Sequence, residues 1–368
     1  MSKIEIKKIN KGKLIINPIS YGNKTLNIKQ ATTVINENYT EEEVNEIVEQ
    51  ATRDYINVIE HKISGTYVIP ETITELGYMS FAGQQNVVNY ICHNGITSLG
   101  SANTFRWNTS LKSINLPQNE NITAIPPYCF ANCTALERLE NITIPSNITS
   151  IGDYAFNTDT ALLNATIPST VKTIGVNCFQ SDSKLTTVDF EGVTSLGNLC
   201  FDNCTKLVNV NLPNVTSIGE SCFYRTSALR VLELPKLTTV KNYSFRGSGI
   251  YQFIFPNTVT NLNLTGVLQE AKSLKLVDIP SGVTAIGGNF FYNCTALQTV
   301  IVRRPTPPSL NASAFRGVKA NGKIYVPYGC SAAYLASAAW ATSTGNYYPK
   351  KYGWTIHELD EDGNIPTE

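Results

Sequence analysis

Two cysteines lie four residues apart in the segment LCFDNCTKL, residues 199–207. Thiolates at such a spacing can hold a metal ion or form a redox pair, so Cys200 and Cys204 are the first candidates for chemistry. The chain has nine cysteines, an odd number without the paired spacings of small disulfide-stapled secreted domains. Free thiols are the simpler interpretation.

Other residues with catalytic potential are sparse. The three histidines, His61, His93 and His357, lie far apart in the chain. His61 and His93 flank the first unit of the repeat described below and could meet, although a hydrogen-bonded surface imidazole is the commoner case than a zinc ligand. The sequence contains no GxSxG, HExxH or phosphate-binding glycine loop. It therefore predicts neither an enzyme nor a bound metal or cofactor.

A repeat of about 23 residues organises the chain. A phenylalanine recurs at steps of 22 to 26 residues, with Leu268 in its place once. We call this column the ladder; its members are Phe81, Phe105, Phe130, Phe156, Phe179, Phe201, Phe223, Phe245, Leu268, Phe291 and Phe315.

Each repeat has the same internal pattern. A glycine often stands four residues before the ladder residue, as Gly152 does before Phe156, and predicts a positive φ or a close backbone approach at a corner. A leucine usually follows six residues after it and opens an alternating segment closed by proline, such as LVNVNLP. Such alternation predicts a strand with one buried face. Stacked units would form a parallel solenoid of about eleven coils, about 50 Å long at about 4.8 Å per coil.

The repeat also explains the cysteines. The position before the ladder residue holds Cys200 in one coil and serine, threonine or alanine in several others, and the position three residues after it is equally mixed. A metal-ligand set would not alternate with such residues, whereas a free cysteine behaves as a small buried hydrophobe. Both Cys200 and Cys204 are therefore predicted to be structural.

The segments SIGDYAFNTDTALLNATIPSTVKTIG and SIGESCFYRTSALRVLELP resemble the BspA-type leucine-rich repeat, a family of surface-interaction proteins of bacteria, some protists and bacteriophages. GKIYVPYGCSAAYLASAAWAT, residues 322–342, resembles the strand and short helix that often follow the last repeat. The likeness covers about residues 66–345 and departs at a three-residue insertion in ALERLENITIP and at Leu268. It implies a leucine-rich-repeat solenoid, mainly β with short turns and helical segments, that recognises a partner without catalysis.

The amino-acid composition limits the classes of binding partner that can be expected. Charged residues make up 16% of the chain, against roughly 25% for an average soluble protein. The 29 basic residues balance the 29 acidic ones, so recruitment of nucleic acid by bulk charge is not expected. The N-terminus lacks the apolar core of a signal peptide, and no apolar run has the length of a membrane span. No membrane insertion is predicted.

Residues 1–65 do not fit the repeat and are predicted to form a small α+β anchor or oligomerisation segment. Residues 1–29 hold seven lysines against one acid, and residues 30–60 hold eight acids against Arg53. Residues 13–35 indicate strand, turn and strand. A capping-box pattern at Thr40 and Glu43 begins a helix. That helix either covers the first coil or forms a coiled coil, with a trimer as one possibility, through an apolar stripe of Val44, Val48, Ala51, Tyr55 and Val58.

Residues 66–320 form the predicted solenoid, and residues 321–368 form its C-terminal cap, whose acidic end ELDEDGNIPTE, residues 358–368, we expect to be loose. The cap is rich in large aromatic side chains, among them Tyr334, Trp340 and Trp354. We expect these rings to cover the end of the array, since an open solenoid end would expose its core. A sugar-binding platform is the alternative use of such a cluster.

The residues two and four positions after each strand leucine are predicted to point outward. In the second half of the array these rows add apolar residues to a polar face, which favours protein contact; strand propensity alone is the alternative explanation. The acids of these rows lie two coils apart, too far for a retaining glycosidase pair and near the outer limit for an inverting one. The candidate binding residues are Asn209, Asn211, Val231, Glu233, Gln252, Ile254, Leu276, Asp278, Thr299 and Ile301.

Two settings fit these features. In the first, the chain is a structural or fibre-like component on the surface of a bacteriophage virion, where its N-terminal segment docks to a larger assembly and its array binds protein or glycan on a bacterial surface. In the second, it is a bacterial cell-surface adhesin whose signal peptide is missing from the sequence. Both are recognition functions without catalysis.

Overall fold

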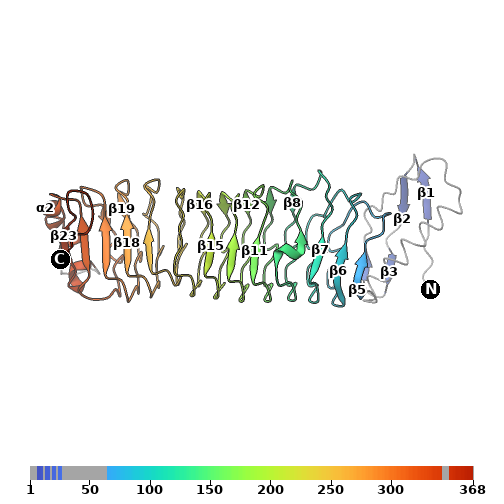
Figure 1. The fold of residues 1–368 in the computed structure, drawn as a ribbon, viewed down its shortest axis with the longest axis horizontal. Helices are drawn as coiled ribbons and strands as arrows, with labels where there is room; N and C mark the ends of the chain where they lie inside the picture. The colour runs from blue at the N-terminus through green and yellow to red at the C-terminus, as the bar shows by residue number, and fades with distance from the viewer. Residues whose placement is uncertain are drawn as a thin grey trace.

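The computed structural model describes residues 6–10, 13–16, 19–21, 24–26, 64–341 and 348–367. Within them the chain winds into a β-solenoid of about eleven parallel turns with little helix, which confirms the predicted fold class. The coils follow one another along a single long axis and end in the C-terminal strand β23 (Figure 1).

One side of the rod carries the longer strands, which run parallel and pair in register, so that Val188 lies beside Val210. These strands form three successive sheets. The first contains β5 (Gly65–Val68), β6 (Val87–Ile91), β7 (Ser113–Asn115) and β9 (Ile142–Thr143); the second contains β11 (Asn164–Thr166), β13 (Thr187–Asp189) and β15 (Asn209–Asn211); the third contains β17 (Gln252–Ile254), β18 (Leu276–Ile279), β20 (Thr299–Val302), β22 (Lys323–Val326) and β23 (Thr355–Glu358).

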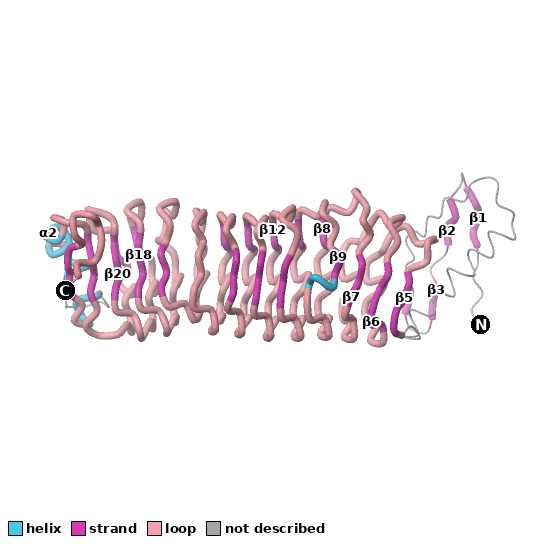
Figure 2. The backbone as a smooth tube through the Cα atoms, viewed as in Figure 1, coloured by secondary structure: helices cyan, strands magenta, loops and turns pink. Residues whose placement is uncertain are grey.

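The opposite side carries two-residue strands, also parallel (Figure 2). One sheet contains β8 (Ala124–Ile125), β10 (Ser150–Ile151), β12 (Thr173–Ile174), β14 (Ser195–Leu196) and β16 (Ser217–Ile218), and another contains β19 (Ala285–Ile286) and β21 (Ser309–Leu310). The three-residue insertion is accommodated by a single 3-10 turn, η1 (Leu139–Asn141).

Before the first coil, β1 (Ile6–Asn10) pairs antiparallel with β2 (Lys13–Ile16), and β3 (Ile19–Tyr21) pairs antiparallel with β4 (Lys24–Leu26). After the last coil come the helices α2 (Ser331–Leu335) and α3 (Ala338–Ala341) and the 3-10 helix η2 (Pro349–Tyr352).

The ladder residues stack along the core. The rings of Phe130 and Phe156 lie 5.4 Å apart and nearly parallel, and those of Phe156 and Phe179 repeat this geometry. Each ladder residue before Phe315 also donates its backbone N–H to the coil that follows, as Phe179 does to the Cys200 carbonyl at 2.9 Å. Apolar burial and backbone pairing therefore hold the same column together.

Tight turns flank each ladder residue. Two residues before Phe179, Asn177 has a φ of 55°, and two residues after it, Ser181 has a φ of 65°. Most other coils repeat this pair of left-handed residues, and asparagine, which tolerates that conformation better than most side chains, often fills them.

The corner glycines allow the backbones of successive coils to approach each other closely. A Cβ on Gly197 would lie 2.5 Å from the carbonyl carbon of Gly175, one coil back. Gly152, Gly175 and Gly219 show the same crowding, and none of these glycines has a positive φ. Of the two roles predicted for this column, close packing of backbones is the one that the structure shows.

Candidate functional site: the outward strand face

The cysteines at positions 200 and 204 are fully buried in the core. The Cys204 thiol donates to the Phe179 carbonyl oxygen at 3.0 Å. Burial raises the pKa of both thiols well above their usual range, so they stay protonated and weakly nucleophilic. Among the residues with described positions, no group of three or more His, Cys, Asp or Glu side chains is arranged to hold a metal ion.

The two histidines that the structure describes, His93 and His357, have hydrogen-bond partners within the chain. His93 Nε2 lies 3.1 Å from the Pro70 carbonyl oxygen and 3.0 Å from that of Ile73, so its ring ties together two neighbouring coils. His357 Nε2 lies 2.7 Å from Thr355 Oγ1. His61 falls outside the described residues.

The outward side of the long strands, from β11 to β20, is the candidate binding surface, which we call the strand face. In β11, β13 and β17 the middle residue is buried between more exposed neighbours, as in β17, where Phe253 is buried between exposed Gln252 and Ile254. The predicted outward residues Asn209, Asn211 and Glu233 are also exposed.

Four exposed apolar side chains gather on three consecutive coils of the strand face. They are Val208, Val231, Tyr251 and Ile254, which are 45%, 59%, 45% and 60% exposed, and we call them the apolar patch. Water-exposed side chains of this size on adjacent coils form the kind of surface that partner proteins cover.

Two patch residues were missed by the sequence rule. Val208 and Tyr251 stand one position after the inward residues Leu207 and Ile250, whereas the rule selected only the second and fourth positions. A bulky apolar residue at the first position was the signal that would have identified them.

The patch lies at a break in the sheet. The second sheet ends at β15 and the third begins at β17. Within the described chain, the segment 231–233 between them forms no backbone hydrogen bond with either neighbour. In the coil after this segment, the inward residue Ile250 follows Phe245 by five positions instead of six. The shortened coil is thus adjacent to the segment that forms no backbone hydrogen bonds with the neighbouring strands.

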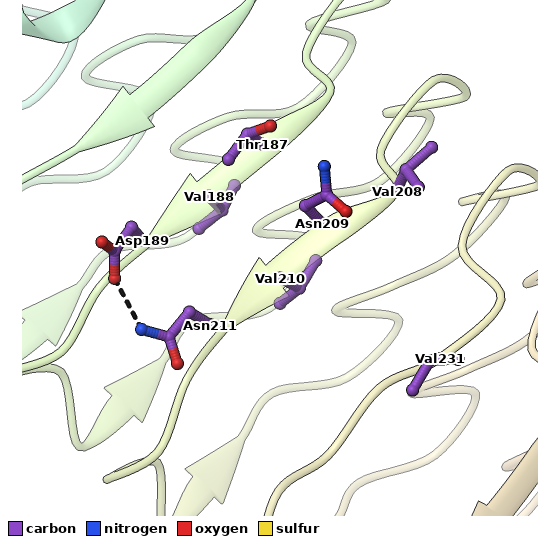
Figure 3. A pocket seen from close by; sticks show the side chains of 8 residues that line it. All are labelled: Thr187, Val188, Asp189, Val208, Asn209, Val210, Asn211 and Val231. Atoms are coloured by element: carbon purple, nitrogen blue, oxygen red, sulfur yellow. Dashed lines mark hydrogen bonds between the residues drawn. The ribbon is translucent and has the colours of Figure 1, made fainter.

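An open concavity adjoins the break (Figure 3). On its polar side, Asn211 Nδ2 donates to Asp189 Oδ1 at 2.7 Å, so the carboxylate is already bound within the face. Val231 stands across the concavity from β13. Its lining residues are Thr187, Val188, Asp189, Val208, Asn209, Val210, Asn211 and Val231.

Towards the C-terminus, the side chains of the strand face are less exposed than the sequence predicts. Leu276 and Thr299 are half-buried, and the prediction that Asp278 and Ile301 are exposed is wrong, because these side chains are only 8% and 5% exposed. The Asp278 carboxylate binds the Arg303 guanidinium at 2.8 Å.

The C-terminal tail causes this lower exposure. Ile301 packs with Tyr325 and Leu359 in a small apolar cluster, and Arg303 donates to the Gly363 carbonyl oxygen. The acidic end was predicted to be loose, which is wrong for its first residues: Glu358 pairs with Val326 at the end of β23, and Leu359 is buried on the face. The exposed part of the strand face therefore ends before β18, whose residues are half-buried or buried.

The aromatic cluster of the C-terminus lies against the last coil. Trp354 and Trp340 contact the Phe315 ring edge-on, with centroids 5.4 Å and 6.4 Å away. Both indoles donate to backbone carbonyl oxygens, of Lys319 and Pro308 respectively. Because Tyr334, Trp340 and Trp354 are almost completely buried, these rings are not available as a sugar-binding platform.

The predicted oligomerisation stripe, Val44, Val48, Ala51, Tyr55 and Val58, lies outside the described residues. Across the described part of the chain, no helix combines the length and apolar character that crossing a bilayer requires.

Comparison with known families identifies the repeat. The family model for the BspA type leucine rich repeat region matches residues 60–186, 136–250 and 238–337. The chain therefore belongs to the BspA-type leucine-rich repeat family, whose members are typically binding proteins without catalytic activity. A search of curated proteins finds no match.

Solved structures of bacterial leucine-rich repeat proteins are similar. A protein from Bacteroides ovatus is 15% identical over 97% of this chain and 99% of its own, with a TM-score of 0.43. The T. pallidum leucine rich repeat protein is 26% identical over 45% of this chain and 77% of its own, with a TM-score of 0.40. A leucine rich cell surface protein from Faecalibacterium prausnitzii is 21% identical over 69% of this chain and 78% of its own, with a TM-score of 0.35.

Proposed function

We propose that this protein is a non-catalytic recognition protein that binds a partner protein through the apolar patch of its strand face. The observation that carries the proposal is the exposure of Val208, Val231, Tyr251 and Ile254 on three consecutive coils. Covering these side chains removes apolar surface from water, at about 25 cal/mol per Å². The polar residues around them, such as Asn209 and Gln252, would provide the hydrogen-bonding rim of an interface.

Membership of the repeat family supports binding as the function, and the resemblance to bacterial surface proteins favours a bacterial cell surface as its setting. This is the second of the two settings that fit the sequence. The virion setting, the docking of the N-terminal segment and the trimer remain predictions that the fold and the family match do not test.

Labelled full-length protein tests the proposal on a panel of intact bacterial and host cells. We expect saturable binding that V231E/I254E weakens at least tenfold, because each glutamate would bury a charge in the interface. T166E is the control: it adds one negative charge to an exposed position of β11 on the same face and should bind like the wild type.

Protease treatment of the cells distinguishes a protein partner from a glycan, since only a protein partner is destroyed. Unchanged binding of V231E/I254E would contradict the assignment of the patch. Equal losses in V231E/I254E and T166E would also contradict it, because the effect would then come from charge anywhere on the face.

A further inference from the structure

Two carboxyl groups are buried in the middle of the rod. Asp159 and Asp182 each stand three residues after a ladder residue, in consecutive coils, and both side chains have no exposed surface. Each has one oxygen with a hydrogen-bond partner: Asp159 Oδ1 accepts from the Cys133 N–H and Asp182 Oδ1 accepts from the Asp159 N–H, both at 2.7 Å. The other oxygens, Asp159 Oδ2 and Asp182 Oδ2, are buried without a donor.

Other residues of the same column show what this position requires. The side chain here repeatedly donates a hydrogen bond to the carbonyl oxygen of the ladder residue one coil back. Asn108 Nδ2 donates to the Phe81 carbonyl at 2.8 Å. The thiols do the same, from Cys133 to Phe105, from Cys204 to Phe179 and from Cys294 to Leu268, at 3.4, 3.0 and 3.0 Å.

An ionised carboxylate cannot donate, whereas a protonated carboxyl has one O–H donor and keeps an acceptor. We infer that Asp159 and Asp182 are held as neutral carboxylic acids, whose Oδ2–H groups donate to the carbonyl oxygens of Phe130 and Phe156. The two acids would then fill the column in the same way as the amide of Asn108. The middle of the rod would thereby contain two protons that the folded chain keeps at neutral pH.

The surroundings agree with this protonation state. Burial raises the pKa of both carboxyl groups well above their ordinary value, and the remaining influences come from backbone N–H groups and from the neighbouring carboxyl, with no cation among them. The titratable groups that face the pair are the thiols of Cys133, Cys178 and Cys204. None of these supplies a positive charge.

The inference has a defined pH dependence. A carboxyl whose pKa is raised by folding contributes stability that is complete below its ordinary value of about 3.8 and is lost as the pH rises towards the folded-state pKa. The folding equilibrium constant of the wild type should therefore fall by up to about tenfold per pH unit for each retained proton. D159N/D182N keeps the donors and acceptors without the protons, so it should lack this loss.

Urea denaturation of full-length protein between pH 4 and pH 8 measures the effect. The ratio of the folding equilibrium constants of D159N/D182N and wild type should rise with pH. E191Q removes one exposed carboxyl just after β13, in the coil that contains Asp182, and is the control, whose ratio to the wild type should stay nearly constant. A ratio for D159N/D182N that does not change with pH would overturn the inference.

Infrared spectroscopy provides a readout that does not depend on the variants. At pH 7 the exposed carboxyl groups are ionised, so a carbonyl band of protonated carboxylic acid in the folded wild type would come from buried acids. We expect such a band, and we expect it to disappear on unfolding at the same pH. Its absence from the folded protein would overturn the inference even if D159N/D182N failed to fold.

Discussion

The cysteines show how a position in the repeat determines the chemistry of a side chain. Eight of the nine thiols are buried and Cys330 is partly exposed. In the ladder-adjacent columns a thiol fills a small space and can donate to a backbone carbonyl, as Cys204 does. Serine and threonine fill equivalent places in other coils, where Ser244 Oγ donates to the Lys241 carbonyl oxygen at 2.7 Å. Small size is the property that most of these side chains share, and those that carry a donor can direct it to a backbone carbonyl oxygen.

Thiol labelling tests that interpretation. A maleimide reagent at pH 7 should modify Cys330 rapidly and the other eight thiols only after unfolding, because burial in the core blocks access of the reagent to these sulfur atoms. Mass spectrometry of native and urea-unfolded protein counts the labels. In C330S, fast native labelling should disappear. Rapid native labelling of Cys200 or Cys204 would contradict a structural role for that pair.

The corner glycines make a second residue-scale prediction. G197A should destabilise the protein by about 1–3 kcal/mol, because its Cβ would meet the backbone of the preceding coil and force the coils apart. Gly77 occupies the same column, but a Cβ there meets nothing within 4 Å, so G77A is the matched control and should change stability little. Urea denaturation measures both, and equal effects would show that stacking of backbones is not the reason for glycine.

Among the strands, the segment 231–233 differs from its neighbours in backbone pairing. Each residue of β13 pairs in register with strands on both sides, whereas no described residue pairs with the backbone of 231–233. Amide hydrogens exchange with solvent when their hydrogen bonds open. The break is therefore expected to be the most labile part of the strand face.

Hydrogen–deuterium exchange tests this expectation. The amides of Val231, Leu232 and Glu233 should exchange at least about tenfold faster than those of Thr187, Val188 and Asp189, since tenfold corresponds to about 1.4 kcal/mol of opening free energy. Peptides from the two segments can be compared in one sample, which controls for pH and temperature. Equal protection would mean that the break closes in solution.

The sequence predicts the structural features that recur in many coils, but not those that occur in one coil only. The ladder, the strands and the burial of Cys200 follow from columns in which many coils agree, so each coil supports the others. The break could not be predicted in this way, because LRVLELP alternates as well as its neighbour LVNVNLP, which contains β15. The burial of the Asp278 side chain depends on its contact with Arg303, 25 residues away. Because this contact occurs in one coil only, comparing equivalent positions of the repeat could not predict it.

At the scale of the whole molecule, each coil contacts mainly its neighbours, and the stability of the rod is approximately the sum of coil and interface contributions. The N-terminal and C-terminal halves are therefore coupled only through the coils between them. Damage at one end should spread inward from that end, whereas a compact globular core would lose stability throughout.

Trp354 offers a direct test of this one-dimensional behaviour, because its ring contacts Phe315 and lies beside Gly322, in the transition from the last coil to the cap. W354A removes a buried aromatic ring and should cost about 3–5 kcal/mol locally. Hydrogen exchange should accelerate in β20 and β22 and stay unchanged in β11 and β13. Y328A, at an exposed aromatic side chain of the same region, is the control and should leave exchange unchanged throughout. Faster exchange in β11 as well as β22 would show that the rod unfolds as one cooperative unit, and the cap would then stabilise all coils together and not only those it touches.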